Sequence, residues 1–455
     1  MVDFVNFLTP GRKGHLVGIG GVSMSSLAEV LLGMGISITG SDMNEGPNVC
    51  ALRGRGIPVY IGHSAENVAP DVDFLVRTAA VHNDNPEVIY AREHDIPVYE
   101  RSQAWGAVSR DYSNALCISG THGKTTTTSM CTHILMAADK DPTVMIGGTL
   151  PLLKAGHRVG HGNTIVMEAC EYYNSFLSFY PTVAVILNIE ADHLDFFRDL
   201  ADVEDSFRAF AERVPGYGNV VANYDDANTM ETLKGLDRKI VTFGLNPEAD
   251  VHAENIRYHG ANSEFDIYYK NRFFTDVTLH VPGQHNVKNA LAATAAAICL
   301  GVRPIAVKYG LAGFNGAGRR FEFKGKFNGA DVYDDYAHHP GELKALLDTV
   351  ETLNYNRTVL VFQPHTYSRT QALFDDFVKQ LSRPDVLLLA EIYAARESNT
   401  IGISSADLAA QVEGAQFFPS FEELEKALRD IARPGDIILT VGAGNVFRIG
   451  EDLVR

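Results

Sequence analysis

The sequence predicts an α/β protein of three domains built around parallel sheets. The chain has 455 residues, about three times the roughly 150 residues of an average domain. Strand-like apolar runs recur along it. Most are followed by a Gly- or Ser-rich turn and then by a helical pattern, which is typical of parallel sheets covered by helices on both faces. The runs are 15–23, 114–125, 163–170, 182–193, 357–370, 385–397 and 436–445.

Composition excludes several classes of protein. Apolar residues make up 45% and charged residues 21% of the chain, as in ordinary globular proteins. The 56 acidic and 39 basic residues give a net charge of −17, which argues against a nucleic-acid or anionic membrane surface. The longest apolar run, near 290–300, is too short for a bilayer, and the N-terminus lacks a secretory signal. We therefore expect a cytoplasmic enzyme without membrane insertion.

Glycine-rich and charged stretches near 106–114 and 314–330 suggest the domain boundaries. We predict domains at 1–108, 109–318 and 319–455. The aromatic-rich, alternating segment 250–281 predicts a small antiparallel excursion within the middle unit.

The first strand leads into a glycine loop, Gly18–Ser23. It matches the dinucleotide fingerprint G-x-G-x-x-G except at the last glycine, where Ser23 stands, and Ser41-Asp42 follows about twenty residues later. The match favours a diphosphate resting on a helix N-terminus. A tight turn without a ligand is the plain alternative.

The strongest signal follows the strand 115–119. A turn with this composition presents backbone N–H groups to phosphate oxygens. Lys124 would reach the β- and γ-phosphates, and the Thr125 hydroxyl would ligate Mg²⁺. Ile118 replaces the first glycine of the strict P-loop pattern, so the loop is a shorter variant. The loop residues are Gly120, Thr121, His122, Gly123, Lys124, Thr125 and Thr126.

Two neighbouring strands end in groups that suit the same crevice. Glu168 and Glu171 follow one strand, and Asp192 and His193 follow the other. Side chains at the carboxyl ends of parallel strands converge. Glu168 is a natural Mg²⁺ ligand, whereas the imidazole of His193 is a less usual one. A solvated strand end and a helix cap are the alternatives.

Further candidates lie later in the chain. Asn286 and Asn289 share one face of an expected helix that ends near Gly301, where they would cap it or contact a nucleoside. Arg319-Arg320 would clamp a phosphate or form a charged hinge. The segments 333–340 and 362–370 concentrate acids, imidazoles and phenols, and Arg369 suits carboxylate recognition.

Together these motifs resemble the Mur ligases, ATP-dependent amide-forming enzymes of peptidoglycan precursor synthesis. The residues that carry the resemblance are GTHGKTTTT, NIEADH, PGQHNVKNALAA, FNGAGRRFE, YDDYAHHP and FQPHTYSRT, which occur in this order across nearly the whole chain. Ser23, Cys170 and Tyr173 depart from the family's common pattern. The resemblance implies a Rossmann-like N-terminal domain, a P-loop ATPase-like central domain and a Rossmann-like C-terminal domain.

The resemblance also implies an activity, that of the alanine-adding branch. ATP, as co-substrate, would phosphorylate the lactyl carboxylate of UDP-N-acetylmuramate, and L-alanine would attack the acyl phosphate. This step serves cell-wall biogenesis, cell shape and cell division. One or two Mg²⁺ ions, replaceable by Mn²⁺, would assist, and the protein would be a monomer or a weak homodimer.

The residue roles that the resemblance implies fall into five groups. Catalytic roles fall to Lys124, Glu168, His193, His338 and Arg369, and metal binding to Thr125, Glu168 and His193. ATP would contact the loop 120–126 with Asn286, Asn289, Arg320 and Asp335. The UDP-sugar would contact Gly20, Gly21, Ser41, Asp42 and His63, and the amino acid Tyr336, His338, His365 and Arg369.

Three alternatives stay open at this point. The chain would otherwise be a related ligase for a murein peptide, an NAD-dependent oxidoreductase using the first glycine loop, or a nucleotide-binding regulator without ligase activity. The oxidoreductase would leave the second loop, 120–126, without a role.

Overall fold

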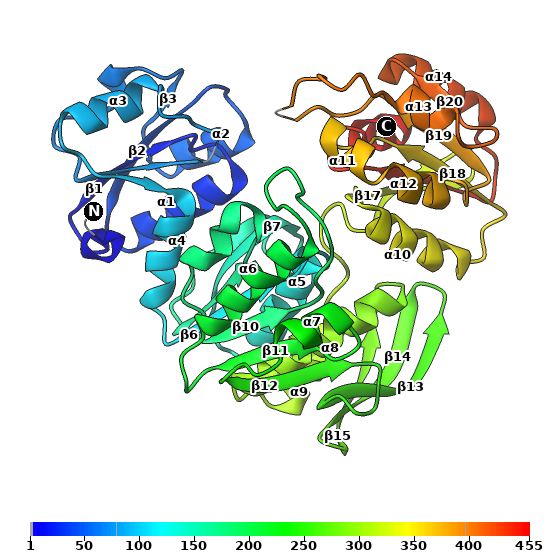
Figure 1. Ribbon diagram of the computed structural model, residues 1–455, viewed down its shortest axis with the longest axis horizontal. Helices are drawn as coiled ribbons and strands as arrows, with labels where there is room; N and C mark the ends of the chain where they lie inside the picture. Colours follow the sequence, from blue (N-terminus) through cyan, green and yellow to red (C-terminus); the bar gives the residue numbers. More distant parts are fainter. Residues whose placement is uncertain (1–2, 79, 396) are drawn as a thin grey trace.

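The computed structural model describes residues 3–78, 80–395 and 397–455. Three sheets divide the chain in sequence order. Figure 1 shows the N-terminal (blue) and C-terminal (yellow to red) domains flanking the central domain (cyan to yellow-green). In the described residues, no helix is both long enough and apolar enough to cross a bilayer.

The N-terminal domain has a five-stranded, fully parallel sheet in the order β3-β2-β1-β4-β5. This order, with helices between the strands, is the predicted Rossmann-like arrangement. The strands are β1 (Lys13–Val17), β2 (Ser37–Asp42), β3 (Val59–Ile61), β4 (Phe74–Arg77) and β5 (Val98–Glu100). The helices are η1 (Phe4–Phe7), α1 (Val22–Gly33), α2 (Pro47–Gly54), η2 (Ala65–Asn67), α3 (Pro86–Glu93) and α4 (Arg101–Arg110).

The central domain has a ten-stranded sheet in the order β15-β14-β13-β12-β11-β10-β6-β9-β7-β8. Its strands are β6 (Asn114–Ser119), β7 (Thr143–Leu150), β8 (Ala155–Arg158), β9 (Thr164–Glu168), β10 (Val183–Ile186), β11 (Asn219–Asn223), β12 (Lys239–Gly244), β13 (Val251–His259), β14 (Asn262–Tyr269) and β15 (Arg272–Leu279). Its helices are α5 (Lys124–Ala137), η3 (Tyr172–Ser178), α6 (Leu200–Glu212), α7 (Ala227–Thr232), α8 (Gln284–Cys299) and α9 (Pro304–Ala312).

The central sheet is parallel only in its middle. Neighbouring strands from β13 to β7 are parallel. At one end of the sheet β8 pairs antiparallel with β7, and at the other end β14 pairs antiparallel with both β13 and β15. The antiparallel excursion predicted at 250–281 is therefore confirmed, and β8 is an unpredicted hairpin partner. The alanine-rich helix α8 packs against α5 and the sheet, because small side chains allow close approach of the backbones.

The C-terminal domain has a six-stranded sheet in the order β16-β17-β21-β18-β19-β20, parallel except for the edge strand β16. Its strands are β16 (Glu322–Phe327), β17 (Ala330–Asp335), β18 (Arg357–Phe362), β19 (Val386–Ala390), β20 (Gln416–Phe418) and β21 (Asp436–Val441). Its helices are α10 (Pro340–Glu351), α11 (Tyr367–Ala372), α12 (Phe374–Leu381), α13 (Ser405–Ala409), α14 (Phe421–Ile431) and α15 (Phe447–Leu453).

The chain passes from the central to the C-terminal domain at adjacent, separately anchored residues. The Gly318 N–H donates to the carbonyl of Thr149 in the central domain at 2.8 Å. The Arg319 side chain instead donates to the Asp334 carboxylate and to the carbonyls of 442 and 444 in the C-terminal domain. The domain limits predicted at 108/109 and 318/319 stay predictions.

Candidate active site

The phosphate loop connects β6 to α5, as its sequence predicts. Gly120 and Gly123 have φ angles of 140° and 82°, a region that glycine adopts without strain. Asn188, which follows β10, holds the loop from the side. Its amide oxygen accepts from the His122 N–H at 2.7 Å, and its amide nitrogen donates to the His122 carbonyl at 3.2 Å. The loop is thus tied to the neighbouring strand before any ligand binds.

Lys124 points its ammonium back into the loop. Nζ donates to the carbonyls of Gly120 and Thr121 at 2.5 and 3.0 Å, and it lies 3.0 Å from Oε2 of Glu171. Burial disfavours the charged form, but the Glu171 carboxylate outweighs it and raises the pKa of Lys124. The ammonium is therefore fully charged at neutral pH, and its role toward the phosphates stays a prediction.

Thr125 and Glu168 form an oxygen-rich corner beside this lysine. The Thr125 hydroxyl donates to Oε1 of Glu168 at 3.2 Å, and the N–H of Gly147 donates to Oε2 at 2.8 Å. Both residues line a cavity of about 540 Å³ between the central and C-terminal domains. Hydroxyl and carboxylate oxygens are the donors that Mg²⁺ prefers, so this part of the predicted metal set fits the ion.

His193 lies on the far side of Glu171. Its ring stacks on Tyr172 with centroids 4.2 Å apart, and Nε2 is 3.8 Å from Oε1 of Glu171. Burial lowers the pKa of His193, so the ring is neutral and able to act as a ligand. The structure thus pairs Thr125 with Glu168 and His193 with Glu171. The metal set of Thr125, Glu168 and His193 stays a prediction.

Seven of the eleven residues predicted to contact ATP line a second cavity of about 260 Å³ between the same two domains, whereas Gly120, Thr121, Lys124 and Thr125 do not line it. The Asn289 amide donates to Oδ1 of Asn286 at 3.2 Å, as their predicted shared face requires. Burial raises the pKa of Asp335 to about 6, although two backbone N–H groups donate to its carboxylate. The predicted residues lining this cavity are His122, Gly123, Thr126, Asn286, Asn289, Arg320 and Asp335.

Of the four residues predicted to face the amino acid, Tyr336 lines the 540 Å³ cavity, and His365 and Arg369 line a third cavity of about 390 Å³. His193 also lines this third cavity. The His338 ring lies 5.8 Å from that of His365, and Tyr336 lies 5.4 Å from His338. Burial lowers the pKa of His338 to about 4, so this ring is neutral.

The N-terminal candidates gather at the carboxyl end of β2. The N–H of Gly20 donates to the Asp42 carboxylate at 2.9 Å, and Gly21 caps α1. The Ser41 hydroxyl donates to Oε2 of Glu87 at 2.6 Å and therefore accepts from Nδ1 of His63 at 3.0 Å. This chain of hydrogen bonds places a hydrogen of His63 on Nδ1.

Sequence reasoning missed three carboxylates, Glu87, Glu190 and Glu342. Glu87 is fully buried, although α3 reads as an ordinary surface helix. Glu342 is the third helical residue of α10 and forms a capping box with His339, a pattern that the sequence displays. Glu190 lies inside the NIEADH segment, but the sequence pattern predicted roles only for Asp192 and His193 of that segment.

Comparison with known proteins decides the family. Family models described as "Mur ligase family, catalytic domain", "Mur ligase middle domain" and "Mur ligase, glutamate ligase domain" match residues 13–113, 118–297 and 319–444. The chain belongs to the Mur ligase family. Curated Mur ligases include the UDP-N-acetylmuramate–L-alanine ligases of Clostridium novyi, 45% identical over 98% of both chains, and of Agathobacter rectalis, 46% identical over 97% of both.

Solved Mur ligase structures share the three-domain architecture. The UDP-N-acetylmuramate-alanine ligase of Thermotoga maritima superimposes with a TM-score of 0.81 at 30% identity, covering 97% of this chain and 98% of that one. A murein peptide ligase of Psychrobacter arcticus, at 24% identity and a TM-score of 0.73 over 97% and 98% of the two chains, shares the fold. The predicted fold class is confirmed.

Proposed function

We propose that this chain joins L-alanine to the lactyl carboxylate of UDP-N-acetylmuramate with ATP as co-substrate, in peptidoglycan precursor synthesis. The observation that carries the proposal is the 43–46% identity, along nearly the full chain, to relatives named for this reaction. The proposed substrates, ATP and a nucleotide sugar, are cytoplasmic compounds, so we place the reaction in the cytoplasm.

The chemistry requires charge neutralisation rather than a covalent protein intermediate. The γ-phosphoryl group passes from ATP to the lactyl carboxylate, which gives an acyl phosphate and ADP. The amine of L-alanine then attacks the acyl carbon, and phosphate leaves as the amide bond forms. Lys124, held charged by Glu171, stabilises the transferring group.

Thr125 and Glu168 would hold Mg²⁺, with His193 as a further ligand of the one or two ions. The ion would neutralise phosphate charge when bound. Asn286, Asn289, Arg320 and Asp335 would hold the nucleotide in the cavity that they line. Arg369 and the neutral His338 would face the alanine. Because these groups come from two domains, the two domains must be docked for reaction, and docking keeps water from the acyl phosphate.

Product analysis tests this proposal directly. Purified protein, ATP, Mg²⁺ and UDP-N-acetylmuramate are incubated with L-alanine, glycine, L-serine or the murein tripeptide, and ADP release and product mass are measured. We expect a UDP-sugar–alanine product, lost in Lys124→Ala and retained in Lys140→Ala, an exposed lysine just beyond the same helix. Turnover of the tripeptide alone would indicate the recycling ligase. ADP release without an amide product would indicate the regulator.

A further inference from the structure

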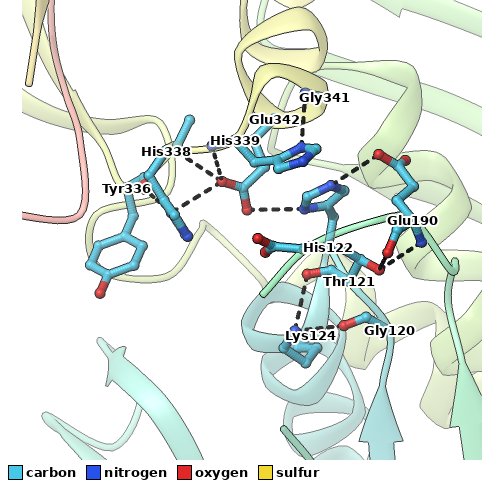
Figure 2. Close-up of polar contacts among 12 residues, drawn as sticks. Gly120, Thr121, His122, Lys124, Glu190, Tyr336, His338, His339, Gly341 and Glu342 are labelled. Carbon is cyan, nitrogen blue, oxygen red and sulfur yellow. Dashed lines mark hydrogen bonds and ion pairs between the residues drawn. The ribbon is translucent and has the colours of Figure 1, made fainter. Parts of the chain in front are cut away.

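The side chain of His122 bridges two glutamates that belong to different domains. Nε2 lies 3.3 Å from Oε2 of Glu190, which follows β10 in the central domain. Nδ1 lies 3.4 Å from Oε1 of Glu342, on the first turn of α10 in the C-terminal domain. Figure 2 shows the imidazole of His122 between the two carboxylates. A residue of the phosphate loop therefore contacts the C-terminal domain directly.

The environment of this ring favours a cation. An imidazole can donate from both nitrogens only when it is protonated, and here both face a carboxylate. Burial disfavours that charge, but Glu190 and Glu342 outweigh it and raise the pKa of His122 to about 10. The pKa of Glu342 lies well below its ordinary range, because the charged His122 and Arg320 oppose the effect of burial. The bridge is thus one imidazolium between two carboxylates.

A metal ion is a poorer explanation of the same cluster. Potential ligand atoms of His122, Glu190 and His339 lie within 4.8 Å of one another. However, Nδ1 of His339 accepts from the N–H of Gly341 at 3.2 Å. The neutral ring of His339 must then carry its hydrogen on Nε2, which is buried without a hydrogen-bond partner in the described structure and cannot ligate a metal. His339 presents a donor, so the cluster is a polar bridge.

We propose that His122 is a positioning residue that couples the phosphate loop to the docking of the C-terminal domain. The proposal deepens the proposed function, on which it rests, because it concerns how ATP binding assembles that site. Asn188 clamps the His122 backbone, and Lys124 follows two residues later, so a shift of the loop moves the bridge. Gly341 and Glu342 line the nucleotide cavity together with His122. Occupancy of the loop and the position of α10 are therefore linked through one side chain.

Amide hydrogen exchange of residues 338–346 tests the link without requiring amide-bond formation. The proteins compared are wild type, His122→Gln, Glu342→Gln and the double variant, each with and without adenylyl imidodiphosphate and Mg²⁺. Glu351→Gln is the matched control, because it makes the same change on the last turn of α10, where the exposed Glu351 side chain pairs with Arg383 at 2.8 Å.

We expect the nucleotide to slow exchange at 338–346 in wild type and in the control, and each single variant to lose about tenfold or more of this protection, as for a largely buried ion pair. The double variant should lose no more than either single one, because both changes break the same bridge. Additive losses, or full protection in both single variants, would overturn the proposal.

Two further measurements separate the possible causes of a positive result. Glu190→Gln removes the other carboxylate and should raise the KM for ATP without equal loss of kcat. Thermal unfolding identifies any variant that fails to fold. If His122→Gln does not fold, the exchange pattern of the isosteric Glu342→Gln alone tests the coupling. If the alanine ligase assay fails while the exchange pattern holds, the proposed function is wrong and the coupling stands.

Discussion

Arg369 and Asp192 form an ion pair that crosses from the C-terminal domain to the central domain. Arg369 donates from Nε and Nη2 to Oδ1 of Asp192 at 3.1 and 2.9 Å. The two side chains are only 10% and 8% exposed. Burial would raise the pKa of Asp192, but the Arg369 guanidinium outweighs this effect and holds the pKa far below its ordinary range. Both groups are therefore charged, and the buried charge of each side chain is compensated by the other.

Removing either member of this pair should impair substrate binding and stability more than removing one member of a surface ion pair would. An uncompensated buried charge costs about 3–5 kcal/mol. We expect Asp192→Asn and Arg369→Gln each to raise the KM for L-alanine at least tenfold and to lower the melting temperature, measured by steady-state kinetics and calorimetry. Arg383→Gln, which breaks the more exposed pairs with Asp348 and Glu351 in the same domain, should change neither. Equal effects from all three variants would contradict a special role for the interdomain pair.

Glu168→Gln should change the dependence on Mg²⁺. The substitution keeps the size of the side chain but removes the charge that accepts from Thr125 and Gly147. We expect the half-saturating Mg²⁺ concentration for ADP release to rise about tenfold or more, because a neutral amide oxygen is a weaker ligand for a hard cation. Glu212→Gln, on the exposed end of α6, serves as the control. An unchanged Mg²⁺ titration would remove Glu168 from the metal set.

Glu87→Gln should affect the UDP-sugar rather than ATP. A glutamine amide can donate to the Ser41 hydroxyl, which would then donate to His63 and reverse the hydrogen bond that places a hydrogen on Nδ1 of that ring. We expect the KM for the UDP-sugar to rise about tenfold, while the KM for ATP stays within twofold. A change in both constants, or in neither, would argue against this role.

The same residue gives a pH prediction. Burial would raise the pKa of Glu87, but His15, with Nε2 3.5 Å from the carboxylate, and the hydrogen-bond donors Ser41 and Asn67 lower the pKa below the ordinary 4.5. The ionised carboxylate thus stabilises the fold above pH 4.5, and this contribution is lost as the pH falls through and below that value. Acid unfolding should therefore be less steep in Glu87→Gln than in wild type, as followed by circular dichroism.

His133 provides an independent pH test away from the catalytic groups. Burial, with the ring edge-on to Phe314 at 5.5 Å, lowers the pKa of His133 from 6.5 to about 4. The unfolded chain binds the proton first, so the contribution of the neutral ring is complete above pH 6.5 and is lost as the pH falls from 6.5 to 4. His133→Gln should flatten the melting temperature across this window. An unchanged slope would show that the ring is accessible to water.

Gly106 tests the packing of α4 on the central domain. A Cβ at this position would overlap the carbonyl of Ser178, so Gly106→Ala should destabilise the protein by about 1–3 kcal/mol despite the helix propensity gained. At Gly54, the end of α2, a Cβ would meet no atom of the described residues within 4 Å, so Gly54→Ala should be neutral or slightly stabilising. Chemical denaturation of the two variants compares them directly.

Local sequence signals were sufficient for the buried parallel strands and for the phosphate loop. Continuous apolar runs and glycine turns predicted β6, β9, β10, β18, β19 and β21, because those strands are buried on both faces. The hairpin of β7 and β8 escaped prediction. Its pairing is interrupted by a register shift between Met145 and Leu150, and it carries no two-residue turn signature.

Partnerships between domains lay beyond the sequence. Glu190 and Glu342 are 152 positions apart, and nothing in either segment indicates that both face His122. Likewise, the order of hydrogen bonds from Glu87 through Ser41 to His63 depends on where α3 packs. Motifs identified candidate groups, whereas their pairing required the relative positions of the sheets.

The adjacent anchors at Gly318 and Arg319 mean that a single peptide unit carries the covalent connection between two independently fastened bodies. Separation of the two domains would therefore require rotation about this peptide unit, because no flexible linker is available to extend between these adjacent residues. Inserting residues at this point should loosen the coupling between the two domains without unfolding either one. Splitting the chain at this bond would give two fragments whose reassembly relies only on noncovalent contacts such as those of His122 and Arg369. The affinity between the two fragments, measured with and without a bound nucleotide, would then show how strongly the nucleotide favours docking of the two domains.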